Sequence, residues 1–171
     1  TWKLIVRHPR ESLIVMGLTA GGTLGYYTFT TYIQKFLVNT SGFSKTDATW
    51  MTAVGLVVFM AVNPLLGALS DRIGRRPILI AFGIAGTLLT WPLLSTLART
   101  HEIAPALALT CAGMVLVAFY SSVNGVVKAE LFPAEIRALG VALPYSFANA
   151  LFGGSAEAVG LWFKHRGMES G

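Results

Sequence analysis

Between residues 67 and 76 the chain reads Gly67-Ala-Leu-Ser-Asp71-Arg72-Ile-Gly74-Arg75-Arg76, and this stretch decides the fold. It separates two apolar runs, 48–70 and 77–98, that contain no charged residue. A helix needs about 20 residues to cross the hydrocarbon core of a bilayer. The stretch therefore predicts a hairpin of two transmembrane helices, in which Gly74 permits a tight reversal and the arginines hold the turn at the membrane surface.

Three further runs have the same character, at about 12–37, 103–127 and 138–163, and Lys35 and Glu157 are the only charged residues inside them. The runs lack the alternation of transmembrane β-strands, so helices must satisfy the backbone in lipid. The sequence thus predicts an all-α membrane protein with five transmembrane helices.

The composition excludes an ordinary soluble domain. Hydrophobic residues make up 54% of the chain and charged residues 12%, against about 25% charged residues in soluble domains. The net charge of +5 comes from residues in short loops and termini rather than from a basic stripe. We therefore expect a lipid bilayer, and no nucleic acid, as partner.

Lysine and arginine also predict the orientation. The N-terminal segment, the 67–76 stretch and the loop after the fourth run, which includes Lys128 and Arg137, together hold eight basic residues, and the other side holds five. The positive-inside rule then places the N-terminus and the 67–76 stretch in the cytoplasm. A chain that starts at Thr1 and ends outside after five spans is expected to be part of a longer protein.

Two local patterns predict packing and a helix start. Gly17, Gly21 and Gly25 recur every four residues and predict a strip where another backbone approaches closely. Ser44 and Asp47 have the spacing of a capping box, which predicts a helix start just before residue 48.

The pattern Gly-x-x-x-Asp-Arg-x-Gly-Arg-Arg between two spans resembles the cytoplasmic loop motif of the major facilitator superfamily. A second segment, Glu130-Leu-Phe-Pro133-Ala-Glu135-Ile-Arg137-Ala-Leu-Gly140, resembles the Glu-x-x-Pro-x-x-x-Arg-x-x-Gly element that follows the tenth helix of this superfamily. The resemblance implies a partial major facilitator fold, helices seven to eleven of a twelve-helix transporter, whose N-terminal half lies outside this chain.

Longer stretches at 26–35, 128–133 and 152–157 resemble the metabolite:proton symporters of this superfamily. That resemblance implies symport of a proton with a small anionic metabolite, a dicarboxylate such as 2-oxoglutarate, by alternating access in a bacterial inner membrane. Another substrate, such as a betaine, citrate or shikimate, stays open. So does a non-transporting role in membrane assembly.

The first span carries Tyr27, Thr31 and Gln34 at i, i+4 and i+7, on one face of a regular helix. This face is expected either to contact substrate or to form hydrogen bonds between helices. Weaker substrate-binding candidates lie on the fourth and fifth spans: Tyr120, Ser121, Asn124, Tyr145, Ser146 and Asn149.

Lys35 and Glu157 are both expected near the outer boundary, because each lies far along a span that runs outward. They are candidates for an ion pair, with Lys35 binding a substrate carboxylate and Glu157 coupling to protons. The alternative is a snorkelling lysine and an interfacial glutamate. A dicarboxylate needs cations to bind it, and no basic residue other than Lys35 is expected within these spans. Further basic residues that bind the substrate are therefore expected in the N-terminal half of the transporter.

The motif residues are expected to act as a cytoplasmic gate. By resemblance, Asp71 should face a helix N-terminus of the other half and favour the outward-facing state. Arg72 or Arg75 should reach Glu130 or Glu135. The other gate residues are Gly67, Gly74, Arg76 and Arg137.

An enzymatic activity is not expected. The sequence has no Ser-His-Asp arrangement, paired catalytic carboxylates or phosphate-binding loop. His8, His101 and His165 lie in loops or termini without a second ligand at metal spacing. We therefore expect no metal and no cofactor, and the lone Cys111 implies no disulfide.

Overall fold

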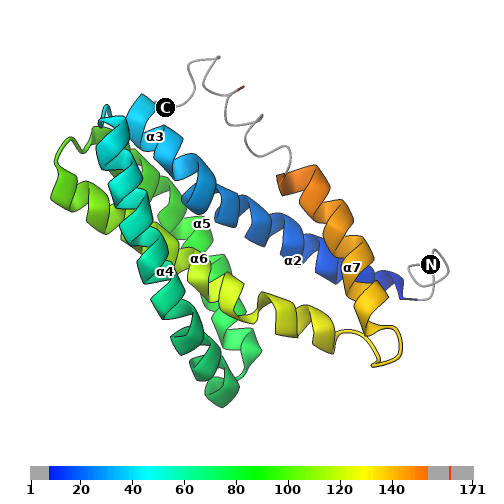
Figure 1. Ribbon diagram of the computed structural model, residues 1–171. Coiled ribbons are helices and arrows are strands. Elements are labelled where there is room, and N and C mark those ends of the chain that lie inside the picture. Colours follow the sequence, from blue (N-terminus) through cyan, green and yellow to red (C-terminus); the bar gives the residue numbers. More distant parts are fainter. Residues whose placement is uncertain (1–7, 154–161, 163–171) are drawn as a thin grey trace.

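The computed structural model describes residues 8–153 and Trp162, and within this part every regular element is helical. The chain order, shown in Figure 1, is α2 (Pro9–Tyr27), η1 (Thr28–Tyr32), α3 (Ile33–Asn39), α4 (Lys45–Ile73), α5 (Arg75–Arg99), α6 (Ile103–Glu130), α7 (Arg137–Ala148) and η2 (Asn149–Gly153). The all-α fold is confirmed.

In the part of the chain that the structure describes, three helices are long and apolar enough to cross a membrane: α4, α5 and α6. The first expected span consists of α2, η1 and α3, which follow one another without a break between residues 9 and 39. The last expected span begins as α7 and η2, and most of its remainder lies outside the described residues. A total of five spans therefore stays a prediction.

The turn of the hairpin is shorter than expected. α4 continues to Ile73 and α5 begins at Arg75, so Gly74 alone separates the two helices. Gly74 has φ 91°, and its N–H donates to the carbonyl of Ser70 at 2.9 Å, which closes the last turn of α4. A residue with a side chain resists this conformation, so a single glycine is enough to reverse the chain.

The start of α4 confirms the expected cap. The backbone N–H of Asp47 donates to Oγ of Ser44 at 3.1 Å. This bond satisfies one of the N–H groups that lack a partner in the first turn of a helix.

Helix α6 forms the centre of the bundle, because it packs against both α4 and α5, while α2 packs against α7 (Figure 1). Phe29, Met51, Leu97 and Met114 are at most 2% exposed and belong to one hydrophobic core shared by these elements. A side chain at Gly113 would overlap the ring of Phe29, so this glycine lets the first and fourth spans meet.

The expected strip of close approach on α2 is displaced by one position. No other part of the described chain lies within 4 Å of a Cβ at Gly17 or Gly21, and Gly25 meets only the ring of Phe82. The close contact is at Gly22, where a Cβ would overlap the ring of Tyr120. The four-residue spacing identified a face of α2 that is rich in glycine. Which glycine is in contact depends on the side from which α6 approaches, and α6 approaches at Gly22.

The segment η1 is a π-helix in which the backbone turn is wider than in an α-helix. The hydroxyls of Thr28 and Thr30 donate to the carbonyls of Leu24 and Tyr26 at 2.8 and 2.6 Å. These hydroxyls donate to backbone carbonyls at the point where the backbone hydrogen bonds change from the α-helical to the π-helical pattern. A second π-helix, η2, follows α7.

Large apolar side chains are exposed on the outer faces of the bundle. Trp50, Met60, Leu88 and Trp91 are each at least 66% exposed. Such surfaces are unfavourable in water, whereas lipid or a second apolar bundle would cover them. The faces of α4 and α5 are therefore suited to a membrane protein.

Candidate functional site

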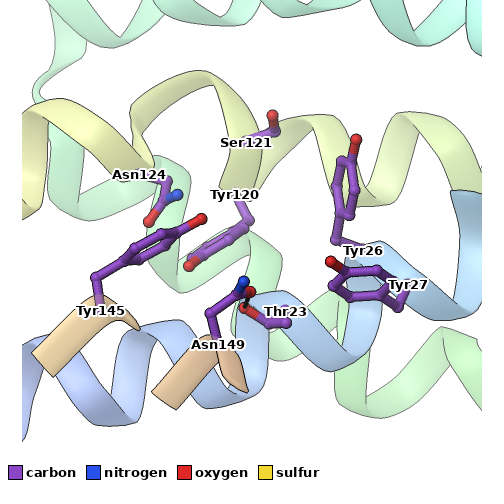
Figure 2. A pocket seen from close by; sticks show the side chains of 8 residues that line it. All are labelled: Thr23, Tyr26, Tyr27, Tyr120, Ser121, Asn124, Tyr145 and Asn149. Carbon is purple, nitrogen blue, oxygen red and sulfur yellow. Dashed lines mark hydrogen bonds between the residues drawn. The ribbon is translucent and has the colours of Figure 1, made fainter. Parts of the chain in front are cut away.

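The candidate site is a cavity of about 220 Å³ between α2, α6, α7 and η2. Among the described residues its lining is entirely polar or aromatic, without a charged side chain: Thr23, Tyr26, Tyr27, Tyr120, Ser121, Asn124, Tyr145 and Asn149 (Figure 2). Pockets for drug-sized ligands are usually about 300–1,000 Å³. This cavity therefore suits a small metabolite.

The structure brings together four of the expected substrate-binding residues, Tyr27, Tyr120, Asn124 and Asn149. They come from α2, α6 and η2, and Thr23 of α2 contacts Asn149 of η2, 126 residues further along the chain. Its hydroxyl lies 3.5 Å from Oδ1 of Asn149, as the dashed line in Figure 2 shows. Ser146, in contrast, is exposed and is not among the lining residues.

Thr31 and Gln34 do not line this cavity. Thr31 is exposed, and Nε2 of Gln34 donates to Oγ1 of Thr49 at 2.8 Å, which joins α3 to α4. The cause is η1, because a π-helical turn adds one residue and rotates the following positions by about 100°. Tyr27 precedes this shift, so it alone of the three lies at the cavity.

Helix α6 supplies Tyr120, Ser121 and Asn124. The ring of Tyr120 is 5% exposed and lies 5.3 Å from the ring of Phe82, measured between centroids. Oδ1 of Asn124 is buried and has no hydrogen-bond partner within the described part of the chain. A buried acceptor of this kind is usually satisfied by water or a ligand.

Lys128 is a functional candidate that the sequence analysis missed. The sequence predicts Lys128 in the loop after the fourth span, but α6 continues to Glu130 and the side chain of Lys128 is 1% exposed. Its Nζ donates to the hydroxyl of Tyr120 at 3.1 Å and lies 4.5 Å from the centroid of the Tyr145 ring. The expectation that Lys35 is the only basic residue within these spans is therefore wrong.

The error has a simple cause. A span that is bounded by its first charged residue ends before Lys128, but lysine, alanine and glutamate are good helix formers, and the next helix-breaking residue is Pro133. The spacing of the polar residues on the fourth span also indicates that Lys128 belongs to the helix. Tyr120, Asn124 and Lys128 follow at i, i+4 and i+8, so they share one face of α6.

Lys35 lies in α3, away from the residues that line the cavity, and its side chain is exposed. Glu157 lies outside the described residues. The pair between Lys35 and Glu157, and proton coupling through Glu157, both stay predictions.

The gate motif forms a local ion pair. Nη1 of Arg75 lies 2.5 Å from Oδ1 of Asp71 and 2.5 Å from Oγ of Ser70. Arg72 and Arg76 are exposed, and no Cβ contact within 4 Å is found at Gly67. Gly67 therefore does not meet a neighbouring helix within the described chain.

The expected ion pairs from Arg72 or Arg75 to Glu130 or Glu135 do not form within residues 8–153. Arg75 reaches Asp71 instead because the one-residue turn at Gly74 brings these neighbours together.

The second motif is explained by contacts within its own turn. Nε of Arg137 donates to the carbonyl of Phe132 at 3.4 Å, and a Cβ at Gly140 would collide with the ring of Phe132. Arginine and glycine thus fix the path from α6 to α7, which in turn places Tyr145 and Asn149 at the cavity.

Within the described residues no group of three histidine, cysteine, aspartate or glutamate side chains could hold a metal ion. His101 contacts the carbonyl of Ser41 at 3.1 Å, and the ring of His8 lies 6.3 Å from that of Phe132. Both are explained by packing at the ends of helices.

Comparison with known proteins agrees with this architecture. The family model described as Major Facilitator Superfamily matches residues 1–161. The chain is 48% identical to the alpha-ketoglutarate permease of Escherichia coli (strain K12), over 96% of this chain and 38% of that protein. It is 34% identical to a citrate-proton symporter of Klebsiella pneumoniae, over 81% of this chain and 31% of that protein.

More distant similarity extends to the ectoine/proline transporter of Corynebacterium glutamicum, at 27% identity over 91% of this chain and 31% of that protein. No solved structure matches the chain significantly. The chain spans less than two fifths of the length of these curated relatives. Together with the paired motifs and the apolar helices, the family match shows that this chain belongs to the Major Facilitator Superfamily.

Proposed function

We propose that this chain forms helices seven to eleven of a proton-coupled symporter, and that the whole transporter carries a small dicarboxylate such as 2-oxoglutarate across a bacterial inner membrane. The polar cavity between α2, α6 and α7 is the observation that carries the proposal. Polar side chains within apolar helices are costly in lipid and normally face a protein interior or a substrate path.

The chemistry of the lining suits an oxygen-rich anion. Tyrosine, threonine and serine hydroxyls and asparagine amides donate hydrogen bonds, and carboxylates accept them. The buried Oδ1 of Asn124 adds an acceptor that a hydroxyl or a protonated carboxyl group would satisfy. Transport does not change the substrate covalently. A cavity that binds the substrate, without catalytic residues, is therefore sufficient for this function.

Alternating access supplies the mechanism. The other half of the transporter would close the cavity from the opposite side, and the two halves would rock about the site. The exposed apolar side chains of α4 and α5 would face lipid or that half.

The test is uptake by the full-length transporter in proteoliposomes. Labelled 2-oxoglutarate should accumulate only under an inward proton gradient, and a protonophore should abolish accumulation. Unlabelled citrate, shikimate and betaine compete in parallel and identify any different substrate. Accumulation without a proton gradient, or a preference for betaine, would contradict the proposal.

Substitutions of residues inside and outside the cavity test whether the cavity binds the substrate. Asn149→Ala should raise KM by about tenfold, the expected effect of removing a hydrogen bond to a charged ligand. Thr31→Ala is the matched control, since Thr31 is exposed and lies outside the lining.

A further inference from the structure

The lining that the structure describes is neutral, but a cation lies directly behind it. Nζ of Lys128 is 3.1 Å from the hydroxyl of Tyr120 and 4.5 Å from the centroid of the Tyr145 ring, and both tyrosines line the cavity. Figure 2 shows these two rings next to each other between Asn124 and Asn149. The ammonium is thus separated from the cavity by one layer of side chains.

The charge of Lys128 has no anionic partner among the residues that the structure describes. Within the described residues no carboxylate forms an ion pair with it, and Glu130, two residues further along α6, is exposed. An ammonium has three donors, and Tyr120 takes one of them. The Tyr145 ring offers a cation–π contact, which offsets only part of the cost of removing the charge from water.

A purely structural role explains this arrangement poorly. An apolar side chain of similar volume would fill the same space without the cost of burying a charge. A buried cation beside a ligand cavity is instead suited to attracting an anion, because electrostatic interactions are strong where water is excluded.

We propose that Lys128 is the positive charge by which this half of the site selects a dicarboxylate over a monocarboxylate. The inference rests on the proposed function and names a specificity-determining residue for it. The hydroxyls and amides of the lining hydrogen-bond equally well to one carboxylate of either ligand. In the proposed arrangement these hydroxyls and amides hold the first carboxylate, and the second carboxylate, which only the dicarboxylate has, lies on the side of Lys128. The Lys128 charge then acts on the difference between the two ligands.

The experiment compares two ligands with the same five-carbon skeleton, 2-oxoglutarate and 2-oxopentanoate, which differ by one carboxylate. Their dissociation constants are measured by calorimetry on the purified full-length transporter. Lys128→Met should weaken 2-oxoglutarate binding by about tenfold or more and 2-oxopentanoate binding much less. Lys128→Arg should keep most of the preference, because it keeps the charge. Lys45→Met is the matched control, since Lys45 is exposed at the start of α4.

Thermal unfolding separates this role from a structural one. Lys128→Met should melt no lower than the wild type without ligand, and it should lose most of the stabilisation that 2-oxoglutarate gives the wild type. A variant that keeps the wild-type preference for the dicarboxylate within about twofold would overturn the inference.

A measurement on the unaltered protein covers the case in which the Met variant does not fold. The dissociation constants of the wild type for 2-oxoglutarate and 2-oxopentanoate are compared directly. We expect the dicarboxylate to bind at least about tenfold more tightly, and equal affinities for the two ligands would overturn the inference. A wild-type protein that binds no 2-oxoglutarate would contradict the proposed function instead.

Discussion

Gly22 of α2 lies directly against the aromatic ring of Tyr120 on α6. Any side chain at this position would occupy space that the ring already fills, and Tyr120 is only 5% exposed. The absence of a side chain on α2 therefore determines where a tyrosine of the cavity wall can lie.

Gly22→Ala should push Tyr120 out of place. The added methyl group overfills a packed contact, so we expect the free energy of unfolding to fall by about 1–3 kcal/mol, together with a higher KM for uptake. Thermal unfolding and uptake by the full-length transporter measure the two effects. Gly21→Ala is the control, because no described residue lies within 4 Å of its Cβ position and alanine favours a helix. Equal effects of the two substitutions would show that the contact does not matter.

The length and apolarity of the runs predicted which segments are helical far better than residue spacing predicted which side chains meet. The uncharged runs predicted α4, α5 and α6 to within three residues at every end, because length and apolarity alone decide whether a segment suits a membrane. The strip at Gly17, Gly21 and Gly25 identified α2 as a packing helix, but the closest contact is at Gly22. Small-residue spacing does not show from which direction the neighbouring helix approaches.

Gln34→Leu should have little effect on substrate binding. Gln34 donates to Thr49 and so joins α3 to α4, away from the cavity. Hydrogen bonds between membrane helices contribute about 0.6 kcal/mol on average, so we expect slightly lower thermal stability and a KM within about twofold of the wild type.

Tyr27→Ala is the companion variant, because Tyr27 lies on the same span and lines the cavity. It should raise KM several-fold. If Gln34→Leu raised KM as much as Tyr27→Ala, the face from Tyr27 to Gln34 would contact substrate as a whole.

The π-helix η1 explains why the polar face could not be placed from the sequence. The i, i+4, i+7 rule assumes 3.6 residues per turn, and a single wider turn breaks that phase. Nothing in the sequence Thr28-Phe-Thr-Thr-Tyr32 marks a π-helix, since threonine and aromatic residues also occur in regular membrane helices. The position of Lys128, in contrast, could be predicted from the sequence, because Lys128 follows Tyr120 and Asn124 at the regular spacing of an α-helix.

Glu157→Gln tests proton coupling. If Glu157 takes part in proton transfer, the variant should exchange 2-oxoglutarate across the membrane but should not accumulate it against a gradient. Uptake and counterflow in proteoliposomes distinguish these two activities. Accumulation equal to the wild type would exclude a coupling role.

The pairing of Glu157 with Lys35 needs a separate test. Lys35→Glu combined with Glu157→Lys restores opposite charges, so the double variant should be more stable and more active than either single variant. Additive effects of the two substitutions would mean that the side chains do not interact.

Asp71→Asn should separate the local and the long-range roles of the gate motif. The Asp71 side chain is 64% exposed and that of Arg75 is 25% exposed, so their pair contributes at most about 1 kcal/mol to stability. Each charge also lies at the helix end whose dipole disfavours it, the anion in the last turn of α4 and the cation at the start of α5. Loss of this pair alone should hardly change thermal stability. If Asp71 contacts the other half of the transporter, uptake should nevertheless fall by about tenfold or more, since a tenfold change requires about 1.4 kcal/mol.

The exchanged pair, Asp71→Arg with Arg75→Asp, tests whether uptake depends on the ion pair itself or on a carboxylate at position 71. It keeps opposite charges across Gly74 and places each charge at the helix end that its dipole favours, so thermal stability should match or exceed that of the wild type. Uptake should stay low, because Asp71 would no longer present an anion to the other half. Glu102→Gln is the control, since Glu102 is an exposed acid at the start of α6. Recovery of uptake in the exchanged variant would mean that the ion pair itself, rather than the position of the carboxylate, is what the motif provides.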